Sequence, residues 1–165
     1  MAGKIHHHLA GDHQRLDALL EHAMSNPENI DAAAYAQFRA GLLKHIGMEE
    51  KVLLPAARKL RGGEPLPVAP RLRLDHGALA ALLVPSATAP VIAAIRAILK
   101  IHNPIEEDPG GMYDQCEELA GAEADQILRQ LQDYSEVRVL PHVDNPFVME
   151  ATRRALARGG YDLQI

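Results

Sequence analysis

The chain contains the segment His45-Ile46-Gly47-Met48-Glu49-Glu50, and the same form, His-x-x-x-Glu-Glu, returns as His102-Asn103-Pro104-Ile105-Glu106-Glu107. On a helix, residues four apart lie on the same face about one turn apart. Each segment therefore predicts a helix that points one imidazole and one carboxylate at a common site. This pair of donors suits iron, with manganese or zinc as possible substitutes.

A second repeated motif precedes each of these segments. Asp12-His13 and Asp75-His76 both continue as Asp-His-x-x-Leu, so the order Asp-His and then His-x-x-x-Glu occurs twice along the chain. We infer that the first two helices and the next two are halves related by a pseudo-twofold axis. Such symmetry naturally builds a centre of two metal ions, with two histidines near each ion and two glutamates between them.

Clear chain breaks divide the first part of the sequence into helical segments. Breaks rich in proline, glycine or serine lie at 25–27, 62–67, 85–90 and 108–111. Between them, apolar residues recur at helical spacing over about 4–24, 31–61, 68–84 and 90–107. Asp31 is a suitable N-cap for the second segment. Because the connections are short, we expect an all-α fold, an up-down-up-down four-helix bundle.

The candidate ligands lie on the apolar stripes of these helices. Spacings of three and four residues indicate the inner face of a bundle helix. The stripes carry polar residues at His13 in the first segment, His45 and Glu49 in the second, His76 in the third, and His102 and Glu106 in the fourth. Burying such a group without a partner costs a few kcal/mol. Because all four helices carry such a polar residue on an apolar stripe, we expect these residues to share a partner, and a metal is the simplest one.

Length, charge and cysteine content narrow the classes of function. A length of 165 residues suits one domain, and a net charge of −5 with no basic run argues against a nucleic-acid partner. No segment predicts a membrane span, since Arg96 and Lys100 interrupt the best candidate. The single cysteine, Cys116, excludes an internal disulfide and fits a reducing compartment. We therefore expect a cytoplasmic protein in which this residue is a plain buried thiol.

The helical pattern weakens beyond residue 111. The remaining sequence predicts one helix or two short ones at 113–134, an extended stretch at 135–142, and a final helix at 145–158. We divide the chain into a bundle at 1–111 and a helical C-terminal extension at 112–165 that packs on the bundle. The sequence indicates no function for this extension.

The repeated motifs resemble the hemerythrin family, in the bacterial branch of HHE cation-binding domains. The resemblance covers about residues 4–113 and rests on Asp12-His13, the run from His45 to Pro55, Asp75-His76 and the run from His102 to Glu107. It implies a four-helix bundle with a non-haem di-iron site. Carried over residue by residue, it implies these iron ligands, with the two glutamates as bridging carboxylates: His13, His45, Glu49, His76, His102 and Glu106.

One position departs from the oxygen-carrying members of that family. They have a fifth histidine one turn after the ligand of the third helix, where this chain has Ala80. The difference predicts an extra open position on one iron, which favours reaction with small ligands over simple carriage. We therefore expect a di-iron protein that binds or reacts with O2, NO or peroxide, and whether it acts as an enzyme stays open.

Other functions fit the same motifs. An iron-handling module, for storage, for donation to damaged iron centres or for sensing, would need the same ligands without catalytic turnover. A structural or zinc-binding bundle would need them without redox chemistry. A ferritin-like oxidase is excluded, because that fold needs two Glu-x-x-His pairs and the chain contains none.

Four acidic residues lie directly beside the proposed ligands. We expect Asp12 and Asp75 to be solvated, and hydrogen bonding to the ligand histidines is the less favoured interpretation. Glu50 and Glu107 are interpreted as outer-face residues or as hydrogen-bond partners of the ligands. Because two prolines can distort the last turn of the fourth helix, Glu107 remains an alternative to Glu106 as the ligand.

Overall fold

The computed structural model describes residues 2–165, and this part of the chain is all-helical, with no β-strand. In chain order the elements are α1 (Lys4–Ala23), α2 (Ala32–Met48), the π-helix η1 (Glu49–Leu53), α3 (Leu54–Leu60), α4 (Ala69–Leu82), α5 (Ala89–Glu107), α6 (Met112–Ala120), the 3-10 helix η2 (Gly121–Glu123), α7 (Ala124–Gln132) and α8 (Pro146–Arg158). None of the helices within the described residues is long and apolar enough to cross a membrane.

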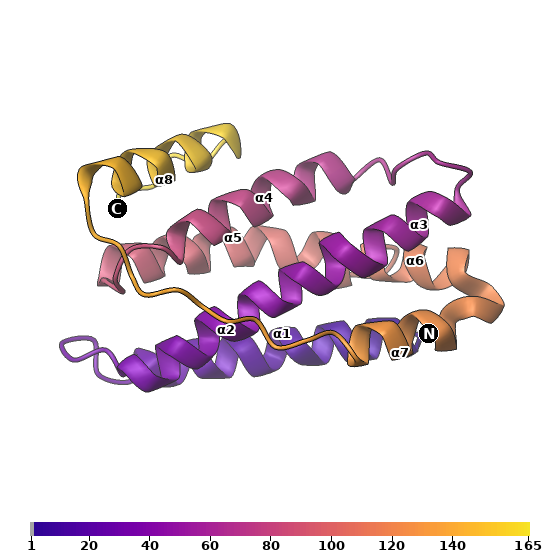
Figure 1. The fold of residues 1–165 in the computed structure, drawn as a ribbon, viewed down its shortest axis with the longest axis horizontal. Helices are drawn as coiled ribbons and strands as arrows, with labels where there is room; N and C mark the ends of the chain where they lie inside the picture. The colour runs from indigo at the N-terminus through magenta and orange to yellow at the C-terminus, as the bar shows by residue number, and fades with distance from the viewer. Residues whose placement is uncertain (1) are drawn as a thin grey trace.

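The long helices lie lengthwise beside one another (Figure 1). α1 packs against α2, and α4 packs against α5. α3 continues the line of α2, while α6 and α7 lie at the end of the molecule where the chain begins. α8 packs on the outside of α4. The extension beyond residue 111 therefore contacts the long helices at two separate places.

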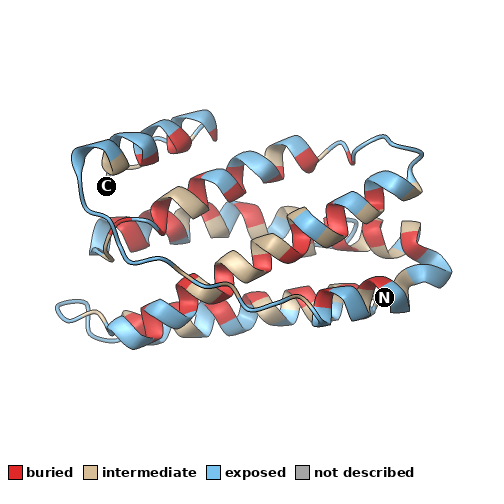
Figure 2. Ribbon diagram, in the orientation of Figure 1, coloured by how far each residue is buried: buried red, intermediate tan, exposed pale blue. Residues whose placement is uncertain are grey.

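Two apolar clusters form the core, and the candidate ligands lie between them. The first cluster includes Leu16, Phe38, Leu79 and Ile95. The second includes Leu9, Leu53, Leu72 and Met112. α1 and α4 run from the second cluster to the first, whereas α2 and α5 run from the first toward the second. The buried residues follow the inward faces of these helices (Figure 2), as the predicted apolar stripes require.

The helix predicted at 31–61 is interrupted by a π-helical turn. This turn begins at Glu49, and the Leu54 N–H donates to the Glu49 carbonyl, five residues back. Pro55 accounts for the change, because it has no N–H to donate to Lys51 and its ring would clash with that carbonyl in a regular α-helix. The wider turn thus begins at a candidate ligand, and π-turns are frequent at functional sites.

Side-chain caps set the starts of three helices. Asp31 accepts a hydrogen bond from the Ala34 N–H at 2.9 Å, which confirms the predicted N-cap of α2. Thr88 caps α5 and Asn145 caps α8 in the same way. Such a cap contributes about 1 kcal/mol, because it satisfies a backbone N–H that has no partner within the helix.

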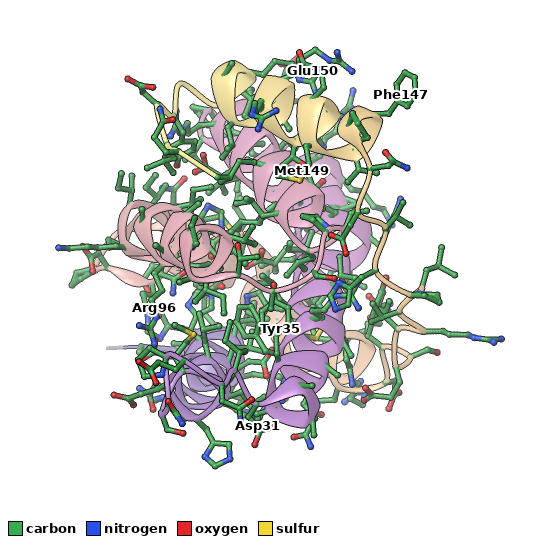
Figure 3. All side chains as sticks on the ribbon, turned by 90° about the vertical axis from the view of Figure 1, so that its left-hand side faces the viewer. Asp31, Tyr35, Arg96, Phe147, Met149 and Glu150 are labelled. Carbon is green, nitrogen blue, oxygen red and sulfur yellow. The ribbon has the colours of Figure 1, made fainter. Side chains whose placement is uncertain are left out.

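The extension is tied to the long helices by Arg39 on α2. Its guanidinium donates to the carbonyl oxygen of Leu83 at 2.9 Å and to that of Leu140 at 3.2 Å. Residues 135–142, predicted as an extended stretch, have no regular secondary structure, and α8 follows them. Phe147 of α8 points away from the other helices, whereas Tyr35 lies between α2 and its neighbours (Figure 3).

Candidate metal centre

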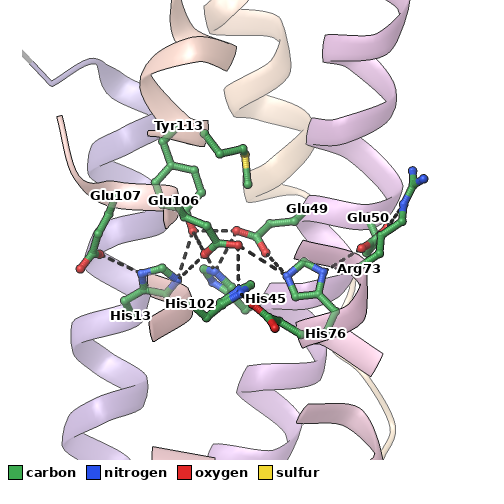
Figure 4. A network of polar contacts seen from close by, with 12 residues as sticks. His13, His45, Glu49, Glu50, Arg73, His76, His102, Glu106, Glu107 and Tyr113 are labelled. Carbon is green, nitrogen blue, oxygen red and sulfur yellow. Dashed lines mark hydrogen bonds and ion pairs between the residues drawn. The ribbon is translucent and has the colours of Figure 1, made fainter. Parts of the chain in front are cut away.

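All six predicted ligands meet in the interior of the molecule (Figure 4). None of their side chains is more than 7% exposed. They come from different elements: His13 from α1, His45 from α2, Glu49 from the first position of η1, His76 from α4, and His102 and Glu106 from α5. Residues far apart in the sequence are therefore brought to one buried point.

The donor atoms of these residues form two overlapping groups. The first group is His13, His45, Glu49 and Glu106, and the second is Glu49, His76, His102 and Glu106. Within each group the candidate ligand atoms all lie within 4.8 Å of one another. Each group can hold one metal ion, and both glutamates belong to both groups. Metal binding by these residues and bridging by the glutamates stay predictions.

The two His-x-x-x-Glu motifs form the expected contacts within one face of a helix. His45 Nε2 lies 3.3 Å from Glu49 Oε1, and His102 Nε2 lies 2.8 Å from Glu106 Oε1. Across the centre, His76 Nε2 lies 3.1 Å from Glu49 Oε2. Glu49 therefore contacts a histidine of each group through a different oxygen, as a bridging carboxylate would.

Each candidate ligand histidine is oriented by a carboxylate on its outer ring nitrogen. The Nδ1 atoms donate from His13 to Glu107 at 2.8 Å, from His45 to Asp12 at 2.8 Å, from His76 to Glu50 at 2.7 Å and from His102 to Asp75 at 3.1 Å. A hydrogen bond of this kind keeps the proton on Nδ1 and leaves Nε2 free to bind a metal. All four imidazoles thus present Nε2 to the centre.

These contacts correct part of the prediction for the four acidic neighbours. The expectation that Asp12 and Asp75 are solvated is wrong: Asp75 is fully buried and Asp12 is 16% exposed. Each precedes a ligand by one residue, about 100° round the helix, where the side chain meets a neighbouring helix. Glu50 and Glu107 are hydrogen-bond partners, one of their two predicted roles. Glu106 faces the cluster, whereas Glu107 lies behind it.

Tyr113 of α6 is a site residue that the sequence analysis missed. Its side chain is fully buried, and its hydroxyl donates to Glu49 Oε1 at 2.6 Å. The same oxygen lies 3.1 Å from Glu106 Oε2, 3.1 Å from His13 Nε2 and 3.2 Å from His45 Nε2. The phenol is therefore in contact with all four residues of the first group.

The only signal for Tyr113 was its place in the chain. It follows the ligand-bearing helix after the tight Gly110-Gly111 turn, which returns the chain toward the ligands. Gly111 permits this close return, because a Cβ there would lie 2.7 Å from the Glu106 carbonyl oxygen. Tyr113 has no counterpart in the internal repeat, so the repeat could not predict it.

Electrostatics make the centre attractive to positive charge. Burial disfavours a charged imidazole, yet Glu49 and the hydrogen bond to Asp12 raise the pKa of His45 to about 10. Burial likewise opposes the charged form of His76, but the surrounding carboxylates raise its pKa to about 11. Burial and the nearby Glu106 disfavour ionised Glu49, and the histidines nevertheless hold its pKa at about 2. Positive charge therefore stabilises the buried carboxylates. This charge can be protons on the imidazoles or metal ions that displace those protons.

Unpartnered buried atoms support a metal ion over protons alone. Glu49 Oε2, His76 Nε2 and Glu106 Oε1 are buried without a hydrogen bond of acceptable geometry. Such atoms are rare in native proteins, because each costs about 1–3 kcal/mol. His76 Nε2 lies 3.1 Å from Glu49 Oε2 and 3.5 Å from Glu106 Oε1, and all three residues are members of the second group. A shared cation satisfies them together, so the donor set fits the predicted ion.

A cavity of about 450 Å³ opens onto the centre, mainly between α1 and α5. Three ligands, His13, His45 and His102, contribute to its wall. The rest of the lining includes the apolar residues Leu16, Leu42, Leu79 and Leu99 and the exposed residues Arg96 and Lys100. The arrangement gives a small molecule a partly apolar route from the surface to the ligand histidines.

No protein-family model, curated protein or solved structure matches the chain. The resemblance to the hemerythrin family therefore stays a prediction based on the repeated motifs. The structure shows two overlapping groups of buried side chains that could hold metal ions.

We predict that Asp12→Ala weakens metal binding without removing a ligand. Loss of the Nδ1 partner leaves His45 free to rotate and to change tautomer, which typically lowers metal affinity about 10–100-fold. The affinity is measured by competition with a chromophoric chelator. Asp17→Ala on the exposed face of the same helix is the matched control and should leave the affinity unchanged. Equal affinities in the two variants would contradict the orienting role of Asp12.

Proposed function

We propose that this chain is a non-haem di-iron protein of the hemerythrin type, which binds or reacts with a small ligand such as O2, NO or peroxide. The observation that carries the proposal is the sharing of Glu49 and Glu106 by two groups of buried donor atoms. A carboxylate has two oxygens and can bridge two ions, which a single imidazole does not do. Two ions, with two histidines each, use all six predicted ligands.

We also propose that the four long helices form an up-down-up-down bundle. In an up-down-up-down four-helix bundle, consecutive helices run in opposite directions. The alternating order in which α1, α2, α4 and α5 meet the two apolar clusters supports this topology. Such a bundle can carry one half of a two-metal centre on each pair of helices, as the internal repeat suggests.

The donor chemistry favours iron. Imidazole combined with carboxylate is typical of non-haem iron sites, whereas thiolate ligands favour zinc or copper. Cys116 belongs to neither group and lies buried with its Sγ 3.7 Å from Met112 Sδ. Manganese and zinc accept the same nitrogen and oxygen donors, so metal analysis must discriminate between them. When bound, iron supplies Lewis-acid and one-electron redox chemistry at the end of the cavity.

The chain's own residues would prepare the centre for this chemistry. Asp12 and its three counterparts hold the imidazoles in one orientation, so little reorganisation accompanies ligand binding. Leu79 and Leu99 make the cavity wall partly apolar and limit the water that reaches the ions. Ala80, one turn after His76, offers no further imidazole, and we infer that one ion keeps a position for the small ligand.

The metal assignment is tested by the iron content of the purified, iron-loaded chain. We expect about two irons per unmodified chain, and well under two in His102→Ala, because that variant loses one of the four donors of the second group. His22→Ala is the matched control, since this histidine is exposed near the end of α1. Tightly bound zinc instead of iron, or full iron content in His102→Ala, would contradict the assignment.

Narrowing the cavity tests whether a small ligand reaches the iron through it and reacts there. Leu99→Trp should slow the reaction of the ferrous protein with NO several-fold while leaving the iron content unchanged, because the larger side chain fills part of the route. Stopped-flow absorbance measures the rate. Leu119→Trp, at another half-buried leucine that does not line the cavity, is the control. Equal rates in both variants would contradict access through this cavity, and no reaction with NO, O2 or peroxide would favour an iron-handling role.

A further inference from the structure

The two halves of the centre differ in one respect that the internal repeat does not predict. The hydroxyl of Tyr113 contacts His13 and His45, the two histidines of the first group. Within residues 2–165, no hydroxyl makes a matching contact with His76 or His102 of the second group. His76 Nε2 of the second group is buried without a hydrogen-bond partner, whereas the Nε2 atoms of both histidines of the first group lie within hydrogen-bond distance of the phenol oxygen.

The phenol oxygen lies where the four donors of the first group converge. Its distances to their nearest donor atoms are 2.6, 3.1, 3.1 and 3.2 Å. Metal–ligand bonds to nitrogen and oxygen are roughly 2.0–2.2 Å long. An ion bound by these four residues must therefore share the space of the phenol oxygen, and an oxygen retained at this point becomes a donor to the ion.

The protein anchors the ring of Tyr113 close to this point. The ring is fully buried, and its edge-to-face contact with the His6 ring has a centroid distance of 5.9 Å. α6 packs against α1, α3 and α5, and the short turn at Gly111 ties it to the helix that carries Glu106. The phenol cannot withdraw far from the donors without movement of α6, so retention next to the ion is the arrangement that the packing favours.

We propose that Tyr113 is a ligand of the ion held by the first group, and that the two ions are therefore inequivalent. The inference rests on the proposed two-metal centre. Tyrosine oxygen is an established ligand of iron in some haem proteins. On ligation the phenol O–H bond breaks, its proton passes to solvent and no electron is transferred. The first ion then has five protein donors against four for the second, which directs the small ligand to the second ion.

The test uses the full chain loaded anaerobically with ferrous iron and oxidised with ferricyanide, which takes one electron from each iron without requiring O2. We expect a visible absorption band from phenolate-to-ferric charge transfer. Resonance Raman excitation within this band should show tyrosine ring modes that shift when the chain is produced with ring-deuterated tyrosine. This measurement on the unmodified chain does not depend on whether a variant folds.

The matched variants are Tyr113→Phe and Tyr35→Phe. Tyr113→Phe should lose the band while keeping about two irons per chain, because all four other donors of the first group remain. Tyr35 is a second buried tyrosine, in the first apolar cluster and without a hydrogen-bond partner for its hydroxyl, so Tyr35→Phe should keep both iron and band. Circular dichroism checks that both variants are folded.

The outcomes separate this inference from the proposed function. Two irons in the unmodified chain with no tyrosine-dependent band, or a band that persists in Tyr113→Phe, would overturn the ligand role of Tyr113 and leave the two-metal centre standing. Fewer than two irons in the unmodified chain would overturn the centre and this inference with it. Loss of the band in Tyr113→Phe alone, with iron retained, supports the inference.

Discussion

The outer nitrogen of each candidate ligand imidazole donates a hydrogen bond to a carboxylate carried by a neighbouring helix. The four hydrogen bonds link α1 to α5, α5 to α4, α4 to η1, and α2 to α1. Because η1 continues α2, these links form a closed ring through all the long helices. The contacts that orient the donors therefore also set how the helices pack. A shift of one helix would therefore move donor atoms at the centre. A change in the position of a donor imidazole would in turn alter the packing of the helices.

So many ionisable side chains in an interior are costly unless they are paired or bind metal. The two apolar clusters on either side of the ligand layer provide the burial that offsets part of this cost. Pairing alone leaves an excess of carboxylates over imidazoles and leaves Glu49, His76 and Glu106 with unpartnered atoms. On this account metal binding completes the core, and folding and metal binding are coupled.

The convergence of the six candidate ligands could be predicted from the sequence because helical spacing fixes which residues share a face. His45 with Glu49, and His102 with Glu106, lie one turn apart on apolar stripes, and the internal repeat supplies the other two histidines. The direction of Asp75 could not be predicted in this way, because it depends on which neighbouring helix covers that side of α4. The π-turn at Glu49 and the position of Tyr113 likewise depend on chain geometry outside the motifs: Pro55 causes the first, and the turn at Gly111 the second.

We propose that two ions lie within one ring of helices and share Glu49 and Glu106. Anomalous scattering from crystals of the iron-loaded chain, with data collected on both sides of the iron absorption edge, can locate these ions. We expect two iron peaks, one beside His13 and His45 and the other beside His76 and His102, with Glu49 and Glu106 in contact with both. A single peak, a peak that does not change across the iron edge, or glutamates that contact only one ion would contradict this proposal.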